Sequence, residues 1–423
     1  MGELQVIRVF IARNRWLARA GVLRASVLAL ICAVSVCAQD EDTRDSRLQR
    51  QREEKLQQLE PYERTEVETA LFEVKDRRLL ERFQAGYKGF HPLLGGLSTG
   101  SGFAMGTQFI KNGIAGGVLN FQTSGQASFK GYQKYQLGLS APQLAKGRAF
   151  LAFNFALHNS PQEDFFGIGS DSATEDRTNY RLETTEYSGT AGVRPLRRLE
   201  IGTRGGILNT NVGHGTDTRF PSVEETFSAA TTPGLDRQPH YKFGSAFVKY
   251  DYRDNPMNPR SGGYYMGEGG YYDDGDFGAY SFRRWKVEAQ QYFPFFNQRR
   301  VIAFRGKMEL NDTNAGQEVP FYLMPTVGGS EDLRGYREFR YRDRDSLVFN
   351  LEYRWEAFSG LDLALFGDAG DVYHKASDIQ LDKLKTSYGF GFRFNTERSV
   401  FLRIDFGFSP EGMRTFVKFN HVF

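Results

Sequence analysis

An arginine and two carboxylates lie within 35 residues of one another near the C-terminus, and their chemistry is that of a charge pair. Arg334 falls in the stretch Gly328–Tyr336, Asp368 falls in Phe366–Gly370, and Glu352 lies between them. The planar guanidinium fork of an arginine can bind two carboxylate oxygens at once. We therefore expect Arg334 to pair with Asp368 and Glu352, provided that the fold brings the three side chains together.

The remaining residue types that carry chemistry form no recognisable catalytic set. No histidine pair has the spacing of a metalloprotease, and no glycine loop leads into a phosphate-binding helix. The six histidines are scattered: His91, His158, His214, His240, His374 and His421. Asp273, Asp274 and Asp276 offer hard oxygen ligands for a divalent cation, but a solvated acidic loop is the preferred interpretation. We predict no enzyme activity, no cofactor and no metal site.

The one long apolar run lies near the N-terminus and predicts a signal peptide. Ala25 to Ala38 follows four arginines and ends in Val36-Cys37-Ala38, a small-residue pattern that a signal peptidase can cut. A transmembrane helix is the alternative, but it needs about 20 apolar residues. A lipoprotein acylated at Cys37 is a second alternative. Both cysteines, Cys32 and Cys37, fall in the predicted signal peptide, residues 1–38.

The charge balance of the chain argues against nucleic acid as a partner. The chain has 54 basic and 51 acidic residues, and loss of residues 1–38 leaves 49 basic against 50 acidic. A near-neutral chain of this kind has no bulk charge suited to nucleic acid.

Residues 39–85 are densely charged, and the spacing of Thr65 and Glu68 with Val67, Leu71 and Val74 predicts a helix over about 66–83. A partly disordered linker is the alternative for this segment.

From about Gly86 the sequence changes to short segments in which polar and large apolar residues alternate. One face of the segment 346–355 is apolar and ends in aromatic residues, while the other is mostly polar, and the segments 387–394 and 400–408 repeat this pattern. A soluble β-sandwich also alternates. Here, however, the polar face carries Arg, Asp and Gly, whereas the apolar face is almost entirely large residues. That combination is typical of a membrane β-barrel with lipid outside and a polar interior.

Counting back from Phe423 predicts a sixteen-stranded antiparallel transmembrane β-barrel over residues 86–423. The expected strands are 90–98, 101–110, 114–122, 129–140, 148–157, 179–193, 198–210, 241–253, 262–272, 279–293, 301–312, 346–356, 361–370, 386–395, 400–408 and 414–423. Short connections at one end are expected in the periplasm. Long segments at the other end are expected outside the cell, as in outer-membrane barrels.

This arrangement places the charge pair inside the barrel. Asp368 shares a strand face with Asp362 and Phe366, so its carboxylate should point inward, and Glu352 should point inward from the preceding strand. Gly335 lets the chain turn tightly beside Arg334. The alternative is a solvated loop arginine and an ordinary pore-lining aspartate.

Over most of residues 86–423, the chain resembles the bacterial surface antigen superfamily, the BamA-type outer-membrane assembly and translocation barrels. The motifs that carry the resemblance are Leu333-Arg334-Gly335-Tyr336 in the sixth extracellular loop, Phe366-Gly367-Asp368-Ala369-Gly370, Glu352, and the turn Asp251 to Gly262 with Arg253, Asp254 and Pro259. Residues 39–85 leave no room for the β-α-α-β-β periplasmic modules (POTRA) of that family, so the resemblance is to a short form.

The resemblance implies a role in insertion or translocation of proteins or lipids at the bacterial outer membrane. Its partners would be outer-membrane lipid, substrate outer-membrane proteins or periplasmic accessory proteins. The glycine-rich first strand, with Gly95 and Gly96, must close against the last strand, which ends at Phe423, and the resemblance suggests a weak seam there. Glycines that merely permit close packing are the alternative at the seam. A passive or plugged diffusion pore, or a structural outer-membrane protein, is the alternative function.

Overall fold

The computed structural model describes residues 50–54, 86–95, 97, 101–396, 399–419 and 423. The chain divides into two compact units, residues 1–66 and 67–423. In the first unit, residues 50–54 are helical. The predicted signal peptide 1–38, both cysteines, the helix expected over 66–83 and Gly96 lie outside the described residues.

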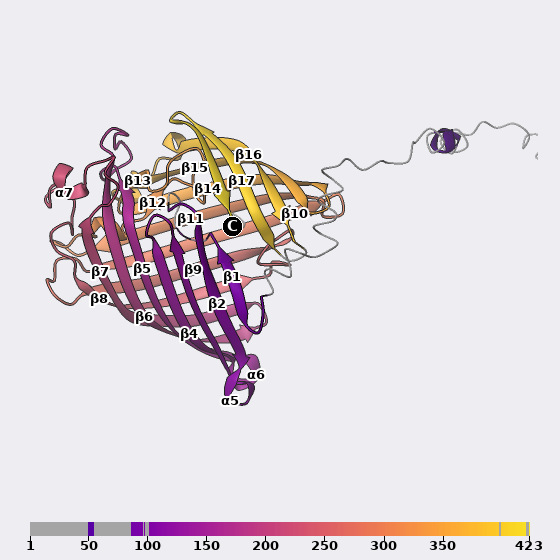
Figure 1. Cartoon of the computed structure of the whole chain (residues 1–423), viewed down its shortest axis with the longest axis horizontal. Helices are drawn as coiled ribbons and strands as arrows, with labels where there is room; N and C mark the ends of the chain where they lie inside the picture. Colours follow the sequence, from indigo (N-terminus) through magenta and orange to yellow (C-terminus); the bar gives the residue numbers. More distant parts are fainter. Residues whose placement is uncertain (1–49, 55–85, 96, 98–100, 397–398, 420–422) are drawn as a thin grey trace, which may run out of the picture. The chain divides into compact units, whose positions relative to one another are not determined.

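The second unit is built on one antiparallel sheet of sixteen strands in sequence order (Figure 1). The strands are β1 (Phe90–Leu94), β2 (Ala104–Gly113), β3 (Leu119–Ser128), β4 (Gln133–Gln143), β5 (Ala149–Phe165), β6 (Thr178–Leu196), β7 (Leu199–His214), β8 (His240–Asp251), β9 (Gly262–Asp274), β10 (Phe282–Phe295), β11 (Arg300–Thr313), β14 (Asp345–Phe358), β15 (Leu361–Tyr373), β16 (Lys385–Asn395), β17 (Val400–Ser409) and β18 (Gly412–Lys418). The predicted fold class and strand number are confirmed.

Most strand boundaries differ from prediction by a few residues, β5 extends eight residues further than expected, and the differences at β1 and β3 coincide with backbone of positive φ. β3 begins five residues later than expected, since Ala115 and Gly116 adopt positive φ angles in the turn α5 (Ile114–Gly117). β1 ends at Leu94, where Gly95 has a φ of 65°. β18 ends at Lys418 instead of continuing to Phe423.

The side chains of the sheet are arranged opposite to those of a water-soluble protein. On β14 one face is buried although it is mostly polar: Ser346, Val348, Asn350, Glu352 and Arg354. On the other face Leu351 and Trp355 are 52% and 43% exposed. On β15 Asp362 and Asp368 are buried, whereas Leu365 is 59% exposed. An apolar outer surface around a polar interior is what a lipid bilayer requires of a barrel.

The connections between strands fall into two groups at opposite ends of the sheet. One end, the short-turn end, carries α5, α6 (Leu144–Gly147) and the turns 197–198, 252–261, 296–299 and 359–360. The other, the long-loop end, carries α7 (Val223–Thr226), η1 (Phe321–Leu323), the small sheet of β12 (Thr326–Val327) and β13 (Tyr341–Arg342), η2 (Ala376–Asp378) and η3 (Leu381–Lys383). Within the described residues no helix is long and apolar enough to cross a membrane.

The sheet curls so that its two edge strands come close. The ring of Phe419, next to the end of β18, lies 6.3 Å from the ring of Phe103 and packs on Gly95 after β1. No backbone ladder joins β1 to β18 in the described part of the chain. Among the described residues, the contacts found across this seam are between side chains and with Gly95.

Candidate functional site: a loop locked inside the barrel

The long loop between β11 and β14, residues 314–344, enters the barrel and places Arg334 against the inner wall formed by β14 and β15. The Arg334 side chain is fully buried. Its Nε and Nη2 donate to Asp368 Oδ2 and Oδ1 over 3.0 and 2.7 Å, and its Nη1 donates to Glu352 Oε2 over 3.0 Å. The backbone N–H of Arg334 also donates to Asp368 Oδ2, over 3.1 Å. We call Arg334, Gly335, Tyr336, Asp368 and Glu352 the loop lock.

Each carboxylate of the loop lock has further donors from the barrel wall. Asn350 donates to Asp368 Oδ1 over 2.9 Å and Ser387 donates to Oδ2 over 3.2 Å. Glu352 Oε1 accepts from Arg393 Nη2 over 2.9 Å and from Arg354 Nε over 3.3 Å. Arg334 is thus the only cation that pairs with Asp368 in the described chain, whereas Glu352 has three cationic partners.

The electrostatics hold Arg334 in its charged form. Burial opposes the charged guanidinium, but the carboxylates of Asp368 and Glu352 outweigh it and raise the pKa of Arg334 above its ordinary value. The ring of Phe366, 3.5 Å from the guanidinium carbon to the ring centroid, covers one face of the group. Removal of one partner from a buried pair of this kind is costly, because it leaves the other charge buried and uncompensated.

Two glycines let the backbone of the loop touch the barrel wall. A methyl group on Gly335 would lie 2.7 Å from the carbonyl oxygen of Phe408, and one on Gly407 would overlap the carbonyl oxygen of Arg334. Ser409 Oγ donates to the carbonyl oxygen of Gly335 over 2.8 Å. The expected reason for Gly335, a tight turn, is therefore incomplete: this residue has no positive φ, and what it permits is close contact with β17.

Tyr336 lies apart from the charges, in an apolar cluster that fixes the base of the loop. It is buried, and its ring lies 5.6 Å from the ring of Tyr341 in an edge-on contact. The same cluster contains Val327, Leu333, Val348 and Val372. The loop is therefore held by apolar packing as well as by charge.

Four residues close to the loop lock were not identified from the sequence. Arg393 Nη1 donates to Asp405 Oδ1 over 2.6 Å, and Arg403 Nη2 donates to the carbonyl oxygen of Ser330 over 3.2 Å. The fourth residue is Gly407, where a methyl group would overlap the carbonyl oxygen of Arg334. Their inward alternation on β16 and β17 was visible in the sequence, but neither the pairing between strands nor the depth of the loop tip was.

Of the predicted seam residues, the structure describes Gly95 and Phe423, which have different neighbours. Gly95 contacts Phe419, as described above, and Gly96 lies outside the described residues. Phe423 is 3% exposed and belongs to a cluster with Tyr292, Val301 and Ala303 on β10 and β11. The structure thus places the C-terminal residue on the inner wall of the barrel and not in a ladder with β1.

The aspartates considered as cation ligands have other roles. The carboxylate of Asp274 accepts from the backbone N–H groups of residues 276, 277, 279 and 280. Asp276 accepts from the backbone N–H and ring Nδ1 of His240, each over 2.8 Å. In the described residues no cluster of three or more His, Cys, Asp or Glu side chains can hold a metal ion.

Residues 96–100 have the Gly-x-Ser-x-Gly sequence that many hydrolases use around a nucleophilic serine. The motif acts at a turn from a strand into a helix. Here the next element is the strand β2, and residue 98 lies outside the described chain.

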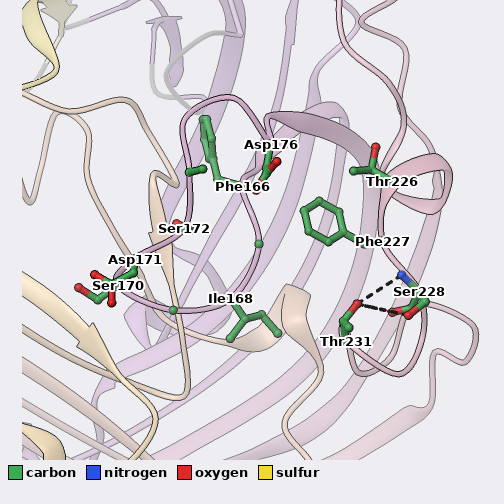
Figure 2. A pocket seen from close by; sticks show the side chains of 13 residues that line it. Phe166, Ile168, Ser170, Asp171, Ser172, Asp176, Thr226, Phe227, Ser228 and Thr231 are labelled. Atoms are coloured by element: carbon green, nitrogen blue, oxygen red, sulfur yellow. Dashed lines mark hydrogen bonds between the residues drawn. The ribbon is translucent and has the colours of Figure 1, made fainter.

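A cavity of about 780 Å³ lies at the long-loop end (Figure 2). The loop from Phe166 to Asp176 forms one side, and the segment Thr226–Thr231 after α7 forms the other. The hydroxyl groups of Ser228 and Thr231 are within 3.4 Å of each other. The lining of the cavity combines hydroxyl groups, aromatic rings and two aspartates. Among these lining residues, no nucleophile is in contact with a base.

Comparison with known proteins supports the fold. A comparison with curated proteins found no match. Among solved structures, BamA from Haemophilus ducreyi lacking POTRA domains 1–3 is similar, with 16% identity, a TM-score of 0.57 and coverage of 78% of this chain and 69% of that one. CdiB from Escherichia coli has 14% identity, a TM-score of 0.52 and coverage of 78% and 62%.

These structural similarities concern the fold. The family is given by the sequence, because residues 120–421 match the model of the Omp85 superfamily domain. The protein therefore belongs to the Omp85 superfamily and is a barrel of the bacterial outer membrane.

Proposed function

We propose that the protein takes part in the insertion or translocation of proteins or lipids at the outer membrane, by a mechanism that makes and breaks no covalent bonds. The observation that carries this proposal is a loop locked inside a barrel whose edge strands share no ladder in the described residues. Family membership supports the same class of function. The long-loop end would face the outside and the short-turn end the periplasm.

In this mechanism the lock holds the barrel wall while the seam opens. Residues 330–335 contact side chains of β11, β14, β15 and β17, so the loop braces the half of the barrel that ends at the seam. The opposite edge, β1, has five residues and, within the described part of the chain, pairs with β2 alone. A short strand with one neighbour has few backbone hydrogen bonds to lose, so it is the edge from which an incoming strand would add.

A crosslink across the seam tests the proposal. Leu94→Cys and Phe419→Cys are introduced into a chain with Cys32 and Cys37 replaced by serine, and a short thiol-reactive crosslinker joins them. The matched control joins Phe406→Cys to Thr415→Cys, which face each other on the paired strands β17 and β18. In cells, only the first crosslink should lower the amount of folded outer-membrane proteins or of outer-leaflet lipid. Unchanged levels in both strains would refute a working seam.

Conductance in planar bilayers separates this role from that of a passive pore. We expect small currents that increase when residues 314–344 are deleted. Large, stable openings that do not depend on the loop would instead identify a diffusion pore.

A further inference from the structure

Three loops that are far apart in the sequence meet at the long-loop end, and Arg340 joins them. Its guanidinium group donates to Glu411 Oε1 over 2.6 Å, in the turn between β17 and β18. It also donates to the carbonyl oxygen of Ser172 over 2.8 Å and to Thr174 Oγ1 over 3.2 Å, in the loop between β5 and β6. Arg340 itself belongs to the loop between β11 and β14 and is 3% exposed. This buried junction brings the neighbouring residues of the three loops together.

Three further arginines lie within three residues of these contacts, so positive charge gathers at the junction. They are Arg177, Arg337 and Arg414. The carboxylates that act on Arg337 most strongly are those of Asp164 and Glu411, and both already have an arginine partner. Asp164 pairs with Arg177 over 2.9 Å, and Glu411 pairs with Arg340 over 2.6 Å. Four arginines therefore share two carboxylates.

The two surplus guanidinium groups are those of Arg337 and Arg414. Neither has a hydrogen bond or an ion pair with another residue of the described chain, and the Nε atom of each is buried. Burial and the like charges of Arg414 and Arg177 lower the pKa of Arg337 below its ordinary value, against the attraction of Asp164 and Glu411. Positive charge that is partly buried without a partner is unfavourable, so an anion would be stabilised here.

Arg414 places this group of charges at the edge of the barrel, at the level of the lipid head groups. It is the third residue of β18, which begins at Gly412 after the turn at the long-loop end. Alternation directs its side chain inward, like that of the buried Phe416, while Met413 and Val417 are each 56% exposed on the outer face. A lipid beside this strand can place its acyl chains against Met413 and Val417 and its head group at the rim. Because no backbone ladder joins β18 to β1 in the described residues, the head group can reach the inner face around this edge.

The charge and geometry of two guanidinium groups fit a phosphate monoester. Each planar guanidinium can donate two parallel hydrogen bonds to phosphate oxygens. A phosphate monoester carries a charge of about −1.5 to −2 at pH 7, which matches two unpaired arginines. A carboxylate would leave one of the two arginines uncompensated.

We propose that Arg337 and Arg414 bind the phosphate group of a membrane lipid, with Arg177 beside them. The ligand class is a lipid with a phosphate monoester head group, which narrows the proposed handling of proteins or lipids to one class of substrate. This assignment rests on the proposed function for the seam, because the head group reaches the inner face past the edge of β18. Binding is measured without transport, so failure of the site and failure of the seam crosslink are separate results.

Lipid binding tests the site directly. The probe is a phosphatidate with two six-carbon acyl chains, titrated into the full chain in an uncharged detergent and followed by native mass spectrometry. Arg337→Gln with Arg414→Gln should weaken binding by about tenfold or more. The matched control, Arg283→Gln, removes an arginine that is paired with Asp312 at the same end of the barrel, and it should leave the affinity unchanged. Equal affinity of the native chain and the double variant would refute the site.

Two competitors identify the source of the ligand. Inorganic phosphate lacks the acyl chains, and the diacylglycerol with the same chains lacks the phosphate. Each should compete with phosphatidate about tenfold more weakly than unlabelled phosphatidate does. Inorganic phosphate that competes as well as phosphatidate would identify a site for free phosphate and overturn the lipid assignment. Diacylglycerol that competes as well would show that the arginines are not used.

Urea unfolding separates binding from folding in the same variants. After lipid removal, the double variant should unfold at a urea concentration no lower than the native chain, because it loses two like charges that no carboxylate of the described chain pairs with. Phosphatidate should raise the midpoint of the native chain and not that of the double variant. A double variant that is less stable than the native chain without lipid would show that the two arginines support the fold, and would refute their assignment to a ligand.

Discussion

The pairing of Arg334 with Asp368 makes a quantitative prediction, because the two partners are not equivalent. Arg334→Met removes the only cationic partner of Asp368 found in the described chain, and leaves a buried carboxylate with Asn350 and Ser387 as its side-chain donors. Breaking a buried pair in this way costs about 3–5 kcal/mol. Asp368→Asn leaves Arg334 paired with Glu352 and keeps one acceptor oxygen, so we expect a smaller loss of about 1.5–3 kcal/mol.

The double variant should be no less stable than Arg334→Met alone, because no carboxylate at position 368 is left unpaired. The cycle then gives a coupling energy of about 1.5–3 kcal/mol between the two positions. Stability is measured by urea unfolding in detergent micelles. Trp285 and Trp355, on the outer face of β10 and β14, report unfolding by fluorescence because they leave the micelle when the sheet dissolves.

A matched control uses a pair in the same barrel that is accessible to solvent. Arg181 and Glu183 form an ion pair whose side chains are 42% and 33% exposed. Arg181→Met and Glu183→Gln should couple by no more than about 1 kcal/mol, since solvent screens such pairs. Additive effects of Arg334→Met and Asp368→Asn, or coupling no larger than in the control, would show that Arg334 does not lock the loop.

Three further predictions concern the loop contacts and the long-loop end. Gly407→Ala should destabilise the protein by about 1–3 kcal/mol and expose the loop to protease, because the new methyl group overlaps the Arg334 carbonyl oxygen, whereas Gly367→Ala, where a methyl group meets nothing within 4 Å, should not. Asp274→Ala should speed hydrogen–deuterium exchange of amides 276, 277, 279 and 280 by about tenfold or more, and Asp273→Ala should not, since these four amides donate to Asp274. Hydrogen bonds from the Arg219 side chain lower the pKa of Asp217. The stabilisation of this loop is therefore present above the ordinary aspartate pKa and is lost as the pH falls through the lowered value. Hydrogen exchange of the Arg219 amide, which donates to Asp217, should follow that pH dependence, and Asp217→Asn should remove the dependence.

Alternation with a period of two residues made the faces of the strands predictable. It placed Asp368 and Glu352 on the inner face because each is an even number of residues from other inward side chains, such as Asp362 and Asn350. The same rule placed Leu351 and Leu365 towards lipid. Strand faces depend on local geometry alone, so a single sequence is sufficient to read them.

Contacts between distant parts of the chain were not predictable in the same way. The alternation of Thr415, Val417 and Phe419 continues in the sequence to Phe423 and favours a strand up to the last residue. In the structure Phe423 packs instead against Tyr292, Val301 and Ala303 on β10 and β11, and no local pattern reveals a contact between parts of the chain so far apart. The role of Gly407 could not be predicted for the same reason, because the backbone that approaches it belongs to Arg334, in a loop about 70 residues earlier in the chain.

The two carboxylates of the loop lock have different roles, and this follows from their partners. Glu352 divides its oxygens between Arg334 on one side and Arg354 and Arg393 on the other, so it remains paired if the loop withdraws. Asp368 has no second cationic partner in the described chain. Withdrawal of Arg334 would leave it as a buried, uncompensated charge, and that cost is what opposes release of the loop. Asp368 is therefore the residue that sets the strength of the lock. Glu352 joins the lock to the wall and, through Arg354, to the ring of Phe423 and to the carbonyl oxygen of Pro259 at the short-turn end.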